Sequence, residues 1–241
     1  MKKIFQILLL SLGLIGCSII DNAELTSITS PFETQVNRIL DLDLSHAESL
    51  KEANKITNPD LAAAVVKELE ARKLQAENAI IEAENVANFA EKIKISDINS
   101  KFTGPEISET KKRGLLIDSD YLNYFLSGIR GNDGLIQHQL HLSIKYDSED
   151  RRNYYSASHC DIWKGCSDDS DEMDISLISS SASGCSGSVC SYTENMELKL
   201  SDEFLRSNMD TGFSVRFNSK KETNKVTISS VYTKGYLKVA K

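Results

Sequence analysis

Four cysteines in the second half of the chain are the residues best placed to do chemistry: Cys160, Cys166, Cys185 and Cys190. In an exported chain such thiols form disulfides, and four cysteines can pair in three ways. Local pairing, Cys160 with Cys166 and Cys185 with Cys190, is favoured because it closes two short loops. Crossed pairing would link the two loops and stays open. Zinc is disfavoured, because the Cys-x₅-Cys and Cys-x₄-Cys spacings suit that metal poorly.

Histidines and serines give weaker signals. His138 and His141 are spaced like a metal-binding pair, but positions three apart on a strand point to opposite faces, so His138 is expected to face inward. His159 is expected in a loop. The serine-rich run 179–184 has no Gly-x-Ser-x-Gly elbow and no evident His and acid partners, so it predicts a flexible loop. We expect no catalytic residue and no cofactor.

An acidic run and a basic-aromatic run could bind ligands. Residues 168–174 are mostly acidic, and Asp169, Asp171 and Asp174 could offer oxygens to Ca²⁺. The run lacks the turn glycine and terminal glutamate of an EF-hand loop, so a solvated acidic loop is preferred. A possible recognition patch consists of Arg151, Arg152, Tyr154 and Tyr155. Arginine and tyrosine are frequent interface anchors, although an ordinary strand explains them equally well.

The N-terminal segment carries the strongest signal in the chain. Two lysines precede an apolar run at residues 4–15, which is too short to cross a hydrocarbon core of about 30 Å but typical of a signal peptide. The run ends in Leu14-Ile15-Gly16-Cys17, which resembles the lipobox of bacterial lipoproteins. The resemblance implies a diacylglycerol on the Cys17 thiol, cleavage before Cys17, and acylation of the new amino group, with palmitate as a typical acyl chain.

The residue after the cysteine bears on location. It is Ser18 rather than an aspartate, which resembles the sorting pattern for the bacterial outer membrane. The expected location is therefore the outer membrane, with the lipid anchor in the bilayer and the chain facing the periplasm or the cell surface. The first two segments are a signal peptide at 1–16 and a lipidated tether at 17–30.

Helical patterns dominate residues 31–95. Ser30-Pro31-Phe32-Glu33 is typical of a capped helix start, and Asn58-Pro59 ends that helix and begins another. The second helix, 59 to about 92, would reach roughly 50 Å. A short break favours antiparallel neighbours, so 31–95 is predicted to be a helical hairpin or spacer, with coiled-coil self-association as the alternative.

Residues 96–113 read as a linker, and strand patterns follow in 114–241. Residues 136–146 alternate between apolar and polar side chains, and 152–158 can return as a paired strand. Further strands are expected at 190–200, 213–217, 226–228 and 231–239, with a helical turn at 201–205. The predicted fold class is α+β, an N-terminal helical hairpin followed by a disulfide-bearing antiparallel domain like a β-sandwich.

Composition restricts the function. The net charge is −7 with no basic block, which argues against nucleic-acid binding. The leading hypothesis is a membrane-anchored, non-catalytic lipoprotein, held in the bilayer by acylated Cys17, whose β domain binds a protein or an envelope component. The alternative is a structural spacer or assembly subunit acting through its helices. An envelope hydrolase is a third, disfavoured hypothesis, because the sequence shows no nucleophile or acid/base constellation.

Overall fold

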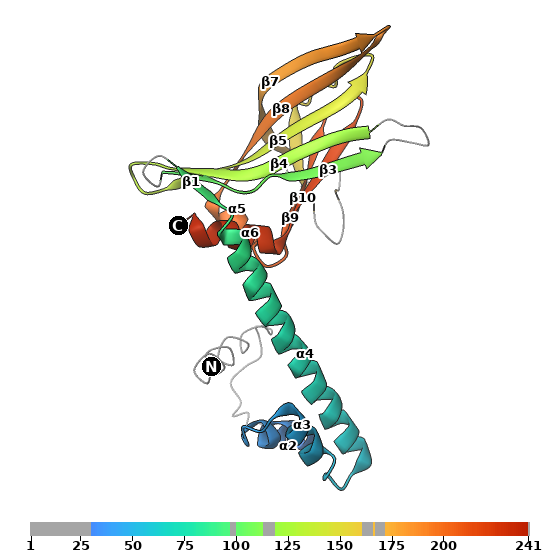
Figure 1. Cartoon of the computed structure of the whole chain (residues 1–241), viewed down its shortest axis with the longest axis vertical. Coiled ribbons are helices and arrows are strands. Elements are labelled where there is room, and N and C mark those ends of the chain that lie inside the picture. Colours follow the sequence, from blue (N-terminus) through green and yellow to red (C-terminus); the bar gives the residue numbers. More distant parts are fainter. Residues whose placement is uncertain (1–29, 97–99, 113–118, 161–165, 167–171, 241) are drawn as a thin grey trace, which may run out of the picture. The chain divides into compact units, whose positions relative to one another are not determined.

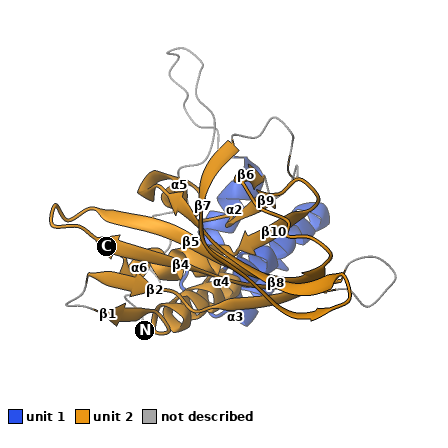
Figure 2. Cartoon of the chain, turned by 90° about the horizontal axis from the view of Figure 1, so that it is seen from above, with its two compact units in different colours: residues 1–75 blue, residues 76–241 orange. Residues whose placement is uncertain are grey.

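The computed structural model describes residues 30–96, 100–112, 119–160, 166 and 172–240. The chain divides into two compact units, residues 1–75 and 76–241, coloured separately in Figure 2. The predicted signal peptide, Cys17, Asp169 and Asp171 lie outside the described residues, so the expectations for them stay predictions. None of the helices in the described ranges combines the length and hydropathy that a bilayer crossing needs.

The first unit is built from helices α2 (Pro31–Leu40) and α3 (His46–Ala53) and the first half of α4 (Pro59–Ala90). The expected cap is present, because the Glu33 backbone N–H donates to Ser30 Oγ at 3.2 Å. The single first helix that we expected is divided in two, since Asp43 has a positive φ of 50° and Ser45 caps a new helix. The helices share one small core: Val36, Ile39, Ala53, Val65 and Leu69.

The second unit is a curled antiparallel sheet with short helices (Figure 1). Its strands are β1 (Lys94–Ser96), β2 (Lys101–Thr103), β3 (Ile107–Lys112), β4 (Ser119–Arg130), β5 (Ile136–Ser148), β6 (Ser156–Cys160), β7 (Glu172–Ser186), β8 (Val189–Leu200), β9 (Phe213–Asn218) and β10 (Thr223–Ile228). They are ordered β1-β2-β4-β5-β8-β7-β6-β9-β10, and β3 also pairs with β4. The α+β class is confirmed. The two-sheet sandwich is not, because β7 joins β8 to β6 and makes the sheet continuous.

The alternation predicted for β5 and β8 matches the observed burial. In β5, His138, Leu140, Leu142, Ile144 and Tyr146 are all buried. Their neighbours at odd positions face outward and are only partly covered or exposed. The inner side chains of the curled sheet therefore form the main core of this unit.

Residues 231–239 were predicted as a strand, and this prediction is wrong. They form helix α6 (Ser230–Val239), which Ser229 caps by accepting the Tyr232 backbone N–H at 3.2 Å. Tyr232, Tyr236 and Ala240 are buried at a spacing of four, so one helical face packs into the sheet. The apolar residues of this segment fit the period of a strand and that of a helix equally well. The Ser229 cap and the tertiary contacts of the two tyrosines favour the helix.

The segment expected as a linker, 96–113, instead carries strands β2 and β3. The end of α4 also belongs to this unit, because Phe89 packs against Tyr232 with ring centroids 4.3 Å apart. Glu82 accepts a hydrogen bond from Lys234 Nζ at 2.7 Å. The last turns of the expected spacer are therefore part of the β-rich unit, and the boundary between the units falls inside α4.

Candidate functional site

The sequence predicts a flexible loop for the serine-rich run at 179–184, and this prediction is wrong. The run is part of the long strand β7. One edge of β7 pairs with β8 from Ile175 onward. The other edge pairs with β6 only through Glu172, Met173 and Asp174. Beyond Asp174, no strand within the described ranges covers this second edge, which lies along the upper border of the sheet in Figure 1.

The uncovered edge, residues 175–186, carries no charged side chain. It does carry two exposed apolar residues, Leu177 at 48% and Ile178 at 56% of full exposure. Register shifts at Leu177/Ser179 and Ser183/Ser186 leave a regular run at 179–183. Unpaired backbone N–H and C=O groups in such a run can accept one more extended strand. The arrangement is therefore a candidate binding edge for a polypeptide.

Two disulfides flank β7 in the sequence. The structure pairs Cys160 with Cys166 and Cys185 with Cys190, as local pairing predicted, with Cα atoms 4.2 and 4.0 Å apart. The second bridge joins the end of β7 to the start of β8. It ties the tip of the binding edge to a strand that is paired along its length with β5.

The proposed recognition patch at 151–155 is divided between surface and interior. Arg151 and Tyr155 are exposed, but Tyr154 is buried and Arg152 is only 2% exposed. Arg152 donates from both terminal nitrogens to the carboxylate of Asp120, at 2.7 and 2.8 Å. Burial acts to lower the pKa of Arg152, but the bonds to Asp120 and Tyr154 outweigh it and raise the pKa above its usual value. Arg152 and Tyr154 are therefore internal and cannot serve in a surface patch.

Buried side chains also hold the backbone of this segment. Arg152 N–H donates to the Tyr146 hydroxyl at 2.8 Å. The N–H groups of Asn153 and Tyr154 donate to the Glu194 carboxyl at 3.2 and 3.3 Å. Because these donors bond to side chains, and Asn153 has a φ of 55°, the segment does not return as a strand on β5 as predicted. The chain re-enters the sheet only at Ser156, beside the start of β7.

His138 and His141 lie on opposite faces of β5, as the spacing predicted. His138 is buried, with Nδ1 2.9 Å from the Tyr236 hydroxyl and Nε2 3.4 Å from Asp202 Oδ1. Burial lowers the pKa of His138, although the bond to Asp202 partly offsets this. The neighbouring strand has Gly128 at this point, where a Cβ would collide with the Tyr236 hydroxyl. His138 therefore fastens α6 and α5 (Asp202–Ser207) to the sheet.

Stability of this unit should fall in mild acid. An unfolded histidine titrates near pH 6.5, and the lowered pKa of His138 means that below this pH the unfolded chain binds more protons than the folded one. We expect the free energy of unfolding to decrease below about pH 6.5, by at most about 1.4 kcal/mol per pH unit for this group. In urea titrations between pH 5 and 8, the free energy of unfolding of His138→Gln should change less with pH than that of the wild type. His46→Gln, in the other unit, should keep the wild-type slope.

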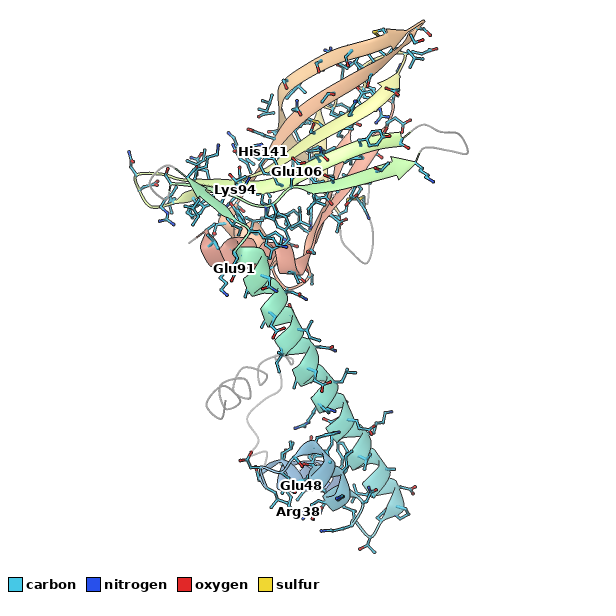
Figure 3. The ribbon with its side chains drawn as sticks, viewed as in Figure 1. Arg38, Glu48, Glu91, Lys94, Glu106 and His141 are labelled. Carbon is cyan, nitrogen blue, oxygen red and sulfur yellow. A yellow bond between two sulfur atoms is a disulfide. The ribbon has the colours of Figure 1, made fainter. Side chains whose placement is uncertain are left out.

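On the outer face, three strands bring together Ser127, His141 and Glu197. Ser127 Oγ lies 2.6 Å from His141 Nε2, and His141 Nδ1 lies 3.1 Å from Glu197 Oε1. A carboxylate only accepts, so Nδ1 carries the proton and Nε2 accepts from the serine. Burial lowers the pKa of His141, with Glu197 opposing the shift. Ser127, His141 and Glu197 stand in the order of a nucleophile, a base and an orienting acid. Figure 3 labels His141, the middle residue of the three.

Two features of the Ser127–His141–Glu197 group favour a structural role. Ser127 is only 2% exposed, so a substrate carbonyl has little access to its hydroxyl. Ser127 also lies in the interior of the sheet, opposite Thr103 of β2 and Gln139 of β5. The neighbouring backbone N–H groups are therefore engaged in sheet pairing and do not form an oxyanion hole.

We expect a fluorophosphonate probe to leave Ser127 unmodified, as read by peptide mass spectrometry. Ser127→Ala should lower the free energy of unfolding by about 1 kcal/mol, the usual net contribution of a hydrogen bond. Labelling of Ser127 that disappears in His141→Gln would contradict this interpretation and revive the hydrolase hypothesis.

The remaining predicted positions do not form a site. Asp174 is the third residue of β7 and pairs with Ser156, while the other two calcium candidates are outside the described residues. His159 is in strand β6, not a loop, and its ring meets Phe204 edge-on. The described part of the chain holds no group of three or more His, Cys, Asp or Glu side chains that could bind a metal ion.

Sequence reasoning missed Asp120 and Glu194 as partners of the 152–154 segment. For Glu194 a signal existed, because the predicted alternation of β8 already placed it on the same face as Met196 and Leu198. An inward carboxyl needs partners, and here they are the Tyr146 hydroxyl and the backbone N–H groups of Asn153 and Tyr154 rather than a cation. No protein-family model matches the chain, and neither the curated proteins nor the solved structures gave a significant match.

Proposed function

We propose that this chain is a membrane-anchored lipoprotein of the bacterial envelope whose β-rich unit binds an extended segment of another polypeptide. The observation that carries the proposal is the edge of β7 at 175–186, which is uncharged and has no strand beyond Asp174 in the described structure. A row of backbone donors and acceptors gives affinity for any extended strand, and neighbouring side chains select among them.

The anchor rests on the lipobox resemblance at Leu14–Cys17. Acyl chains on Cys17 would hold the protein at the bilayer, because each buried CH₂ contributes about 0.8 kcal/mol and two or three chains give stable attachment. Two disulfides within one unit support an oxidising compartment such as the periplasm or the cell surface. In the outer membrane, a bound polypeptide would come from the envelope itself or from outside the cell.

The proposal is tested by a photo-crosslinking amino acid at Ile178 in the full-length protein, produced in its own host. We expect an adduct whose mass exceeds that of the chain by another polypeptide. The matched control is the same amino acid at Tyr121, which is also exposed but lies on β4, a strand paired on both sides. Equal adducts from both positions, or none from Ile178, would rule out the β7 edge as the binding site.

The spacer or assembly hypothesis predicts a different outcome. Its test is deletion of residues 31–75, the helical part of the first unit, which spares the turns of α4 that pack on α6. If the helices carry the function, the shortened protein no longer binds its partner although the β7 edge is intact. If the edge carries it, the Ile178 adduct survives the deletion.

A further inference from the structure

The edges of the sheet differ in the charges that their strands carry, and this difference bears on which partner can pair with them. Natural edge strands carry charges that block pairing between copies. The other outer strands follow this rule, since β3 contains Glu109, Lys111 and Lys112, β10 contains Lys225, and β1 begins with Lys94. The β7 edge at 175–186 has none. Among the described strands, this edge is therefore the one that another copy can approach without meeting a charge on the strand itself.

We propose that the strand taken up by β7 is the β7 of a second copy of this chain, paired antiparallel about a two-fold axis. This inference rests on the proposed function of the edge and names its occupant. An antiparallel pair of identical strands is the symmetric, self-complementary arrangement that a two-fold dimer requires. It joins two ten-stranded sheets into one.

The register follows from the irregularities of β7. Ile178 is skipped between Leu177 and Ser179 in the pairing with β8, and a second shift follows Ser183. Bulges disrupt the ladder, so regular pairing is limited to 179–183. With the two-fold axis at its centre, Ser181 lies opposite its own copy and Ser179 lies opposite Ser183. The exposed side chains of Leu177 and Ile178 flank this short ladder and add apolar contact.

Charge and anchoring both favour this geometry. The full sequence carries a net charge of −7, so two copies repel one another overall, and the uncharged edge is a place where contact adds no further repulsion between strand side chains. A ladder of five residues is short, and in dilute solution it would be weak. Confinement of both copies to one membrane raises their effective concentration and favours a contact of this size.

The test uses the purified, full-length lipidated protein in phospholipid vesicles with the photo-crosslinker at Ile178. We expect an adduct of twice the chain mass, and we expect Ser181→Lys to reduce its yield several-fold, because it places two like charges at the axis. Asn123→Lys adds the same charge on β4, away from this edge, and should leave the yield unchanged. Near-ultraviolet circular dichroism confirms that each variant is folded.

The outcomes separate the two proposals. An adduct in host cells to a different polypeptide, with no self-adduct in vesicles, overturns pairing between copies and leaves the binding edge standing. No Ile178 adduct in either setting overturns both. A self-adduct that Ser181→Lys does not reduce means that the copies meet elsewhere, and this also overturns the inference.

Discussion

Replacing Arg152 with methionine should destabilise the β-rich unit by about 3–5 kcal/mol. The guanidinium is buried and held by Asp120 at 2.7 and 2.8 Å, with further bonds to Tyr154 at 3.0 Å and Asn224 at 3.2 Å. Its removal leaves the Asp120 carboxylate buried without its main counter-charge. The measurement is urea unfolding followed by near-ultraviolet circular dichroism, which reports mainly on this unit because all eight tyrosines lie between residues 121 and 236.

The neighbouring residue provides the control. Arg151→Met changes an exposed arginine next in sequence and should alter the free energy of unfolding by less than about 0.5 kcal/mol. The double variant Arg152→Met with Asp120→Asn removes both charges, so it should lose less than the sum of the single losses. A loss below about 1 kcal/mol for Arg152→Met would show that the network does not hold the 152–154 segment.

Replacing Cys17 with serine should abolish lipid attachment and release the protein from the membrane fraction. The lipobox resemblance implies that the lipid is attached to the sulfur of Cys17, and a serine hydroxyl does not replace the thiol in that reaction. Without acyl chains, nothing in the described residues provides a helix able to cross the bilayer. Incorporation of labelled palmitate and the mass of the N-terminal peptide measure the modification, and centrifugation of lysed cells measures the attachment.

A second substitution in the same segment separates attachment from sorting. Ser18→Asp should retain the palmitate label, because Cys17 is intact, but in a bacterium with two membranes it should move the protein from the outer to the inner membrane. Palmitate incorporation by Cys17→Ser, or a wild-type protein that keeps its leader and carries no lipid, would contradict the anchor.

The internal network and the binding edge are connected through the path of the chain. After β5 the chain does not return as a hairpin, because Tyr146 and Glu194 bind the backbone of residues 152–154 and β8 occupies the second edge of β5. The chain therefore reaches the far side of β7 at Ser156 and covers that strand only at its beginning.

The sequence by itself determined the features that depend on local pattern. The cap at Ser30, the helical turn at 201–205, the alternation in β5 and β8, and the opposite faces of His138 and His141 all follow from backbone period and short-range hydrogen bonds. Local pairing of the cysteines was also favoured by short separations. The lipid anchor rests entirely on the residues up to Ser18, and it stays a prediction.

Only the tertiary structure decided the features that depend on distant partners. Residues 231–239 are a helix because two tyrosines fit against Gly128 and the Leu126 backbone N–H, and the local sequence carries no trace of those partners. The serine-rich run is a strand because β8 lies beside it. Arg152 is internal because Asp120, 32 residues earlier, is buried opposite it. Pairing and burial join residues far apart in the chain, and no local pattern records which ones meet.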